Sequence, residues 1–425
     1  MKLNYKRTFF VGLAFMSISA FWQLYNYVIP LILEYTFHLE EDIIGYVMAA
    51  DNVLALFLLP LFGTLSDKTR TKLGRCTPYI LVGTALASAL MIVLPFADWY
   101  KNFPLFVVVL GVLLLSMSLY RSPAVALMPD VTPKPLRSKG NAVINLMGAL
   151  GGIFTYLIIT VLLPKIDKTT GEKPSSYIVV FAIIAGFMVA AAIILLFTVN
   201  ENKLATEMPK EPEEVQGVKA PLAKPVKKSL VFMLLSVALW YMAYNAVESA
   251  YSRYVLDRWN MPESVGSTMM IVAMLVATAS YIPIGIISSK IGRKKVILGG
   301  VVLMAAAFAV GILMRAYSPV AYAIMGVIGI GWAAINVNSY PMVVEMSRGA
   351  DIGKYTGYYY TFSMAAQVAT PILSGYLFKH FGYEVLFPYA VAFSALAFCT
   401  MLMVKHGDVK ADKKGSVLEN FDVDD

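Results

Sequence analysis

Long apolar stretches constrain this chain more than any other feature of its sequence. A helix needs about 20 apolar residues to cross the roughly 30 Å hydrocarbon core of a bilayer. Twelve stretches of about this length occupy approximately residues 8–36, 43–65, 78–97, 104–128, 138–164, 177–199, 229–256, 263–288, 296–315, 319–345, 354–378 and 383–404. Because lipid offers no partner for an unpaired backbone group, we expect every stretch to be an α-helix. The sequence therefore predicts an all-α membrane protein with twelve transmembrane helices.

The amino-acid composition agrees with a membrane location. Hydrophobic residues make up 58% of the chain and charged residues only 15%, whereas soluble domains carry about 25% charged residues. The formal net charge is +8, but the basic residues lie in short loops between apolar stretches, so we expect no nucleic-acid partner. The two cysteines, Cys76 and Cys399, are far apart and lack a metal-binding spacing. We therefore expect no disulfide framework. No His/Glu metal spacing appears either, and we expect no metal and no cofactor.

The distribution of Lys and Arg predicts how the chain is oriented. Most of the 35 Lys and Arg residues fall in the two terminal tails, the central segment and every second loop. By the positive-inside rule these parts face the cytoplasm, so both termini are expected there, with the protein in the cell membrane. The first apolar stretch is too long for the core of a signal peptide, and we expect it to be retained as a helix.

Two basic loops at matching positions divide the chain into related halves. The first, GTLSDKTRTKLGR, starts at Gly63, and the second, GIISSKIGRKK, starts at Gly285. Asp130 and Glu345 also match, since each stands nine residues before a lysine. The segment between the halves is rich in Lys, Glu and Pro and has no apolar periodicity, which is typical of a linker. We predict six-helix bundles at residues 1–199 and 229–404, a cytoplasmic linker at 200–228 and a cytoplasmic tail at 405–425.

Three ionisable residues, Asp51, Arg121 and Glu248, lie inside apolar stretches. Such a group at the centre of a bilayer costs at least about 2.5–3.5 kcal/mol, which makes each a candidate for function. Asp51 and Arg121 differ in depth by roughly 8 Å, within reach of an extended Arg if their helices face each other. The alternatives are a structural ion pair for these two and an interfacial position for Glu248. We expect Arg253, one turn farther on, to extend to the outer surface.

The two basic loops also carry a resemblance to a known family. GTLSDKTRTKLGR resembles the signature of the major facilitator superfamily between its second and third helices, and GIISSKIGRKK resembles the partner loop between the eighth and ninth. SDKTRTKLGRCTPYI and the later YRSPAVALMPDVTPKPLRSKGNAVINLMGALGG look like the sucrose-transporter-like branch and the glycoside–pentoside–hexuronide:cation symporters. The resemblance covers nearly the whole chain. It implies two pseudo-symmetric six-helix bundles with the substrate site near the midplane between them.

In that family, loops of this kind latch the two halves together on the cytoplasmic side. The resemblance assigns the latch to Gly63, Asp67, Arg70, Arg75, Gly292 and Arg293. Physically, Asp67 follows a helix end and faces basic residues, while Gly63 lets a neighbouring helix approach closely. The alternative is that these charges only obey the positive-inside rule. Ser289 stands where the second loop should carry an acidic residue, so we expect a weaker charge network there.

The resemblance further implies that the first, fourth, seventh and tenth helices line a cavity. A sugar suits a cavity with amide, Arg and carboxylate partners for its hydroxyls and aromatic rings for its C–H faces. The predicted substrate residues are Trp22, Gln23, Asn26, Tyr120, Tyr244, Asn245, Trp332 and Asn336. For any single Tyr, helix packing or a place at the membrane interface is the alternative.

Together these features predict a monomeric secondary active transporter that moves a sugar with a proton by alternating access. Asp51, Arg121 and Glu248 are the predicted coupling residues. Cation symporters of the similar branch carry two second-helix aspartates where this chain has Ala55 and Leu59. This departure favours protons over sodium.

Three alternatives stay open. The 23 Met residues and the aromatic lining would also suit an exporter of amphipathic compounds. A receptor or scaffold that transports nothing is less favoured, because no long folded terminal domain is evident. A facilitator without ion coupling fits the sequence as well. The absence of a Walker loop and of a His/Glu metal pattern argues against an ATP-driven pump or an enzyme.

Overall fold

The computed structural model describes residues 4–132, 137–163, 177–207, 223–346 and 352–408. The predicted tail at 405–425 and the predicted linker at 200–228 lie partly outside the described residues.

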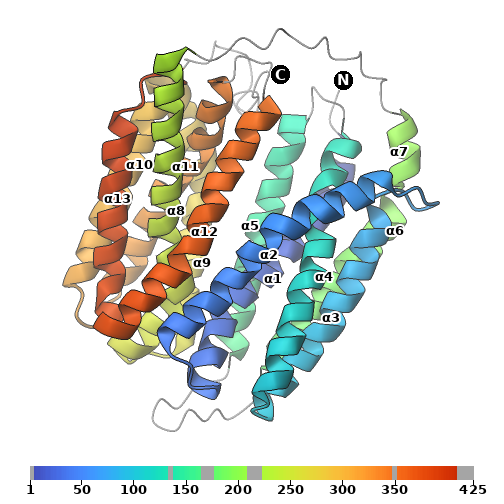
Figure 1. Cartoon of the computed structure of the whole chain (residues 1–425), viewed down its shortest axis with the longest axis horizontal. Helices are drawn as coiled ribbons and strands as arrows, with labels where there is room; N and C mark the ends of the chain where they lie inside the picture. The colour runs from blue at the N-terminus through green and yellow to red at the C-terminus, as the bar shows by residue number, and fades with distance from the viewer. Residues whose placement is uncertain (1–3, 133–136, 164–176, 208–222, 347–351, 409–425) are drawn as a thin grey trace. The chain divides into compact units, whose positions relative to one another are not determined.

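Helices make up nearly all of the described chain (Figure 1). The helices of the first half are α1 (Tyr5–Leu31), extended by the π-helical turn η1 (Ile32–Thr36), α2 (Glu41–Lys68), α3 (Thr77–Trp99), α4 (Phe103–Asp130), α5 (Arg137–Leu162) and α6 (Ile178–Thr198). A short helix, α7 (Glu201–Glu207), follows. The helices of the second half are α8 (Lys224–Trp259), α9 (Glu263–Ile291), α10 (Arg293–Leu313), α11 (Val320–Glu345), α12 (Ile352–Phe381), the 3-10 turn η3 (Tyr383–Val385) and α13 (Leu386–Leu402).

Twelve of the described helices are long, as the apolar stretches predicted. Within the described residues, eleven spans are long and apolar enough to cross a membrane by length and composition. The long helix outside that set, α12, has 30 residues and a Tyr-rich first half, which lowers its hydropathy. A tyrosine ring is still compatible with a membrane helix when its hydroxyl finds a polar partner. The predicted all-α membrane fold with twelve long helices is confirmed.

Local sequence signals explain where several helices begin and end. The side chains of Asn4 and Asn102 accept hydrogen bonds from backbone N–H groups three residues ahead, at 3.1 Å, and so cap α1 and α4. Proline in the first turn starts α3, α4 and α8, where its missing N–H costs nothing. Asn260 takes up a left-handed conformation and ends α8.

The chain divides into two compact units near the predicted halves, with two differences. Unit 1 contains residues 1–40, 50–210 and 262–268, and unit 2 contains residues 41–49, 211–261 and 269–425. Helices α2 and α9 therefore each contribute residues to both units, whereas the sequence had assigned whole helices to one half. The described ends of the predicted linker are also helical, because α7 and the first residues of α8 fall within it.

Small residues let helices pack closely within each unit. In unit 1, α1 packs on α5 and α6, and α3 packs on α4 and α6. A Cβ atom added at Gly151 of α5 would lie 2.0 Å from the carbonyl oxygen of Met16 in α1, so only glycine fits there. In unit 2, α8 packs on α12 and α13, and α10 packs on α11 and α13. A Cβ at Gly300 would lie 2.8 Å from the carbonyl oxygen of Gly331.

Arg253 lies differently from the sequence expectation. Its side chain does not extend to the surface but is buried, with 4% of the residue exposed. The guanidinium pairs with Glu41 at 2.6 Å and lies over the ring of Tyr383 at 5.6 Å. Tyr383 also donates a hydrogen bond to Glu41. The first turn of α2, which belongs to unit 2, thus brings a carboxylate that compensates the buried charge.

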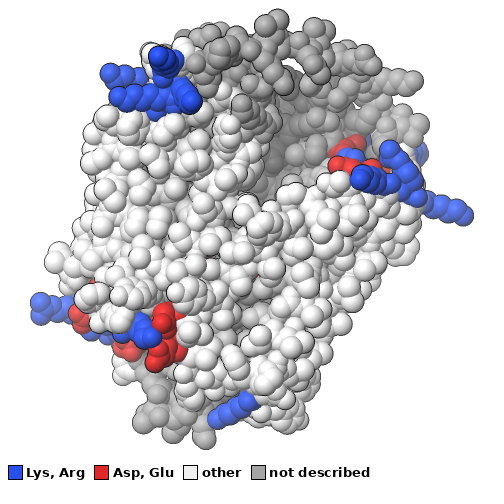
Figure 2. Space-filling view, in the orientation of Figure 1, with Lys and Arg blue, Asp and Glu red and all other residues white. Residues whose placement is uncertain are grey.

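Apolar side chains cover the sides of the helices. Figure 2 shows that on the visible face the charged residues gather at the ends of helices and leave the sides uncharged. Large apolar residues on these sides are strongly exposed, among them Phe57 of α2 at 69% and Val82 of α3 at 53%. Such a surface is unfavourable in water and suits contact with lipid.

Candidate functional site

Three predicted site residues from three helices meet within unit 1. Asp51 of α2 is 8% exposed and accepts a hydrogen bond from Asn52 Nδ2 at 2.9 Å. The guanidinium of Arg121 in α4 interacts electrostatically with the Asp51 carboxylate. The same guanidinium lies over the ring of Trp22 in α1, with Cζ 5.6 Å from the ring centroid, as in a cation–π contact. A carboxylate, a guanidinium and an aromatic face are thus combined at one place.

Tyr25 of α1, which is not among the predicted substrate residues, completes this group. Its ring is 5.4 Å from that of Trp22 and stacks on Phe21 at 6.1 Å. The Tyr25 hydroxyl is electrostatically coupled to Asp51. Its helical spacing from Trp22 places both residues on one face of α1.

Three other predicted residues of unit 1 occupy different surroundings. Gln23 Oε1 accepts a hydrogen bond from Tyr156 of α5 at 2.8 Å. Asn26 is half-buried. Tyr120 is 1% exposed, and its hydroxyl donates to the carbonyl oxygen of Ala14 at 3.0 Å and bonds with Ser17. Because that hydroxyl ties α4 to α1, we leave Tyr120 out of the proposed substrate site.

Unit 2 contains an aromatic platform built from predicted residues. The rings of Tyr244 in α8 and Trp332 in α11 stack in parallel, with centroids 3.9 Å apart and an interplanar angle of 3°. Tyr241 meets Trp332 edge-on at 5.2 Å. A hydrogen bond joins Tyr241 to Tyr359 of α12, whose hydroxyl bonds with Ser339 at 2.9 Å. These bonds hold Tyr241 in place against the ring of Trp332.

Polar residues follow Tyr244 on α8, and another lies on α11. Asn245 Nδ2 is buried and has no hydrogen-bond partner among the described residues. Glu248 interacts electrostatically with Tyr244 one turn before it. Asn336 of α11 is half-buried. Aromatic faces, amides and carboxylates are groups that can bind the C–H faces and the hydroxyls of a sugar.

A second candidate site lies in the loop between α2 and α3, where Arg75 binds two carboxylates. Its Nε donates to Asp130 Oδ2 at 2.6 Å, its Nη2 pairs with the other oxygen of Asp130, and its Nη1 reaches Asp67 at 2.7 Å. The bidentate bond to Asp130 raises the pKa of Arg75 above its ordinary value. Asp67 and Arg75 are therefore together, as predicted, whereas Arg70 is exposed. A Cβ at Gly63 would lie 3.0 Å from Ser122 Oγ, so α2 and α4 come close there.

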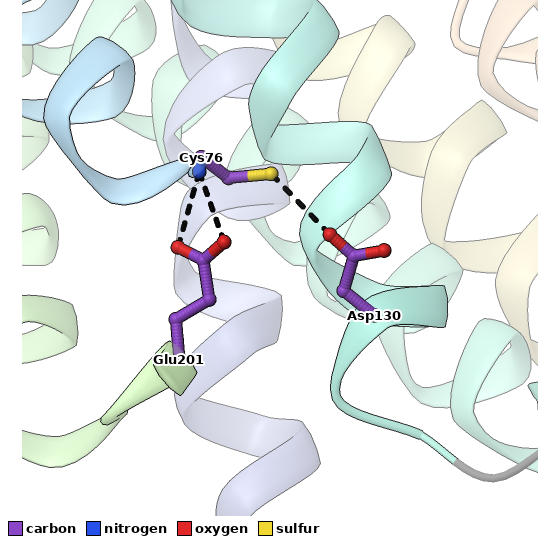
Figure 3. A group of neighbouring side chains, drawn as sticks. All are labelled: Cys76, Asp130 and Glu201. Carbon is purple, nitrogen blue, oxygen red and sulfur yellow. Dashed lines mark hydrogen bonds between the residues drawn. The ribbon is translucent and has the colours of Figure 1, made fainter. Parts of the chain in front are cut away.

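Glu201 of α7, which sequence reasoning missed, caps the N-terminus of α3. Its carboxylate accepts hydrogen bonds from the backbone N–H groups of Arg75, Cys76 and Thr77 at 2.8–3.0 Å and from the Thr77 hydroxyl at 2.9 Å. Figure 3 shows it beside Cys76 and Asp130. Gly74 has φ +114°, and a Cβ there would lie 2.2 Å from Glu201 Oε2. Glycine is thus required both for the backbone conformation and for the carboxylate.

The second half repeats this arrangement with different residues. Arg293 pairs with Glu345. Asp408, after α13, accepts from the N–H groups of Arg293 at 2.7 Å and Lys294 at 3.3 Å. Gly292 has φ +99°, and a Cβ there would lie 3.0 Å from Asp408. In each half, therefore, a carboxylate that follows the last long helix caps the helix after the basic loop.

The group of Cys76, Asp130 and Glu201 resembles a metal site in composition, with ligand atoms within 4.8 Å of one another. Both carboxylates are already compensated, Asp130 by Arg75 and Glu201 by the N-terminus of α3. Burial, together with the charges of Glu201 and Asp130, raises the pKa of the Cys76 thiol. These contacts explain the geometry of the group without a metal.

Comparisons with known proteins agree with the fold. The family model of the Major Facilitator Superfamily matches residues 11–281 and 233–420. An isoprimeverose transporter of Lactiplantibacillus pentosus is 24% identical over 280 residues, which is 63% of this chain and 56% of that protein. A raffinose carrier protein of Pediococcus pentosaceus is 23% identical over 61% of this chain and 42% of its own length. The matched region thus spans about half the length of these relatives.

Solved structures support the same architecture. The structure of a nucleoside transporter, NupG, superposes on this chain with a TM-score of 0.70 at 15% identity. The superposition covers 95% of this chain and all of NupG. A peptide transporter of the POT family superposes with a TM-score of 0.71 at 11% identity over 94% of this chain and 93% of that one. At these identities the likeness concerns the fold alone.

Proposed function

Because the chain belongs to the Major Facilitator Superfamily, we propose that it is a secondary active transporter that carries a sugar and a proton together across the cell membrane. It works by alternating access as a monomer with both termini in the cytoplasm. The observation that carries this proposal is the electrostatic interaction of Asp51 with Arg121, whose guanidinium lies over the ring of Trp22, within the membrane-spanning part of unit 1.

The sugar substrate is supported by the chemistry of both units. Unit 1 offers an aromatic ring, a guanidinium and a carboxylate, and unit 2 offers the stacked rings of Tyr244 and Trp332 and the buried amide of Asn245, the residue after Tyr244. Rings bind the C–H faces of a pyranose, and the polar groups bind its hydroxyls. The names of two relatives, an isoprimeverose transporter and a raffinose carrier, point the same way.

Proton coupling through Asp51 is supported by its neighbours. Desolvation favours the protonated form of a carboxylate, whereas a nearby guanidinium favours the ionised form, so small movements change the proton affinity. A metal cation would be repelled by Arg121, and Ala55, one turn away on α2, supplies no second carboxylate. A proton is therefore the coupling ion that best fits this group. Glu248, beside the platform of unit 2, is the second candidate.

The networks around Arg75 and Arg293 are proposed to act as the cytoplasmic latch. Each joins a basic loop to a carboxylate at the end of α4 or α11 and to a carboxylate beyond the last long helix of its half. Charge-assisted bonds of this kind are strong, yet they break without covalent change. They suit elements that must form and release during transport.

Counterflow in proteoliposomes tests the transport function. We expect unlabelled isoprimeverose or raffinose inside the vesicles to drive uptake of the same labelled sugar. Uptake of amphipathic cations with no sugar counterflow would instead support an exporter of amphipathic compounds. A protein active toward neither class would contradict the proposal.

The coupling role of Asp51 is tested by Asp51→Asn, which mimics the protonated carboxyl but cannot release a proton. We expect this variant to lose sugar accumulation driven by a pH gradient while it keeps sugar exchange at equilibrium. Asp42→Asn, on the same helix but in a surface ion pair with Lys379 at 2.8 Å, is the matched control. Normal accumulation by Asp51→Asn would exclude Asp51 as the coupling group, and loss of exchange and folding together would favour a structural ion pair.

A further inference from the structure

Two hydrogen-bond donors on α1 lack partners although they are buried. Trp22 Nε1 and the Tyr25 hydroxyl are both inaccessible and form no hydrogen bond with any described residue. Tyr25 is 2% exposed as a whole. The two rings touch, with centroids 5.4 Å apart. The orphan donors therefore form one local group.

Leaving such donors unpaired is costly. A buried polar group without a partner costs about 1–3 kcal/mol. Three other buried tyrosines of unit 1 avoid this cost, since Tyr120 bonds with Ala14 and Ser17, Tyr27 donates to the carbonyl oxygen of Glu263, and Tyr156 donates to Gln23. A phenylalanine at position 25 would fill the same space without the penalty. The hydroxyl is thus better explained by a partner that binds from outside the chain.

The surroundings of the two donors indicate what that partner is. Arg121 adds a third donor beside Trp22, and Asp51 adds an acceptor near Tyr25. Trp22 and Arg121 are partly exposed, so a ligand can approach from their side. Each sugar hydroxyl both donates and accepts a hydrogen bond, so neighbouring hydroxyls on a ring can use donors and an acceptor at once.

We propose that Tyr25 and Trp22 are specificity-determining residues that donate hydrogen bonds to two neighbouring oxygen atoms of one pyranose ring. Tyr25 selects for one particular hydroxyl, and the indole N–H of Trp22 binds the oxygen beside it. This inference rests on the proposed sugar transport and names the residues of unit 1 that recognise the ring. A site built to bond a hydroxyl rejects the analogue that lacks it, because the donor is then left unpaired again.

The test combines protein variants with modified sugars. Counterflow uptake of labelled isoprimeverose is measured for the parent protein and for the variants Tyr25→Phe and Trp22→Phe. Unlabelled isoprimeverose and its monodeoxy derivatives are added as competitors. If the parent does not bind isoprimeverose, raffinose and its derivatives are used instead. For the parent, we expect removal of one hydroxyl to weaken competition by about tenfold or more. Tyr25→Phe should bind the intact sugar more weakly by a similar factor. The derivative that lacks this hydroxyl should then compete as well as the intact sugar does. Trp22→Phe should show the same behaviour at the adjacent position.

Tyr120→Phe is the matched control because its hydroxyl already has partners inside the protein. It should lower the melting temperature and keep the discrimination among deoxy sugars. Tyr25→Phe should leave the melting temperature unchanged or raise it, since no internal hydrogen bond is lost.

Two results would overturn the inference in distinguishable ways. If Tyr25→Phe and Trp22→Phe discriminate among the deoxy sugars as the parent does, the two donors do not contact the substrate, and the proposed transport function is unaffected. If the parent binds neither isoprimeverose nor raffinose, the proposed function and this inference fail together.

Discussion

Replacing Glu201 by Gln should loosen the loop between α2 and α3. The Glu201 carboxylate accepts four hydrogen bonds at the N-terminus of α3, three from backbone N–H groups and one from the Thr77 hydroxyl. Glutamine keeps one carbonyl oxygen, which can accept about half of them, and it removes the negative charge from the positive end of the helix dipole. At about 1.5 kcal/mol or more for each charge-assisted bond, two lost bonds amount to roughly 3 kcal/mol. Because 1.4 kcal/mol corresponds to a factor of ten, local opening should become about 100-fold more frequent.

Alkylation of Cys76 measures this opening directly. The cysteine is completely buried beside Glu201, and its raised pKa keeps the thiol protonated at neutral pH, so labelling requires the loop to open. In a Cys399→Ser background, we expect Glu201→Gln to accelerate labelling by about 100-fold. Removing the negative charge of Glu201 also favours the thiolate form of Cys76, which speeds labelling even without opening. A second variant that keeps the carboxylate is therefore needed.

Gly74→Ala is that variant. Its added Cβ would displace the Glu201 carboxylate while the charge stays, so labelling should again accelerate. Gly382→Ala is the control, because Gly382 also has a positive φ of +69° but no atom lies within 4 Å of its added Cβ. Labelling rates of Glu201→Gln and Gly74→Ala that stay within a few-fold of the parent would refute the capping role of Glu201.

Two further predictions concern the ion pairs. Glu41→Gln should lower the free energy of unfolding by about 3–5 kcal/mol, because it leaves the buried charge of Arg253 without its carboxylate. Glu384→Gln breaks an exposed pair and should lower it by less than about 1 kcal/mol in the same unfolding measurement. Asp130→Asn should accelerate Cys76 labelling more than Asp67→Asn, since the Asp130 side chain is 18% exposed and bidentate whereas that of Asp67 is 58% exposed. Equal effects of Glu41→Gln and Glu384→Gln, or of Asp130→Asn and Asp67→Asn, would contradict this ranking of the ion pairs by burial.

The sequence predicted the features that depend on local pattern. The lengths of the apolar stretches determine the number and type of the long helices, because membrane thickness sets the length of a span. Asp67 and Arg75 were expected together because they share one short loop. Asp51 and Arg121 were paired from their depths in the membrane, and in the structure the two charges interact.

Other contacts depend on tertiary structure and could not be read from local pattern. Glu201 and Asp408 lie in polar segments after the long helices, where apolar periodicity carries no information. Arg253 was expected at the surface because its carboxylate partner, Glu41, is 212 residues away in the sequence. Tyr120 was chosen for the cavity, but which hydroxyls are used inside the protein becomes visible only when the helices are packed.

Proton movement on addition of sugar tests the central claim most directly. Weakly buffered proteoliposomes that contain the parent protein are mixed with isoprimeverose or raffinose, and the pH of the external medium is followed. Proton-coupled uptake predicts an immediate alkalinisation that a protonophore abolishes and that Asp51→Asn does not produce. Sugar uptake without any change in external pH would contradict coupling to protons, and a pH response that Asp51→Asn retains would contradict its assignment to Asp51.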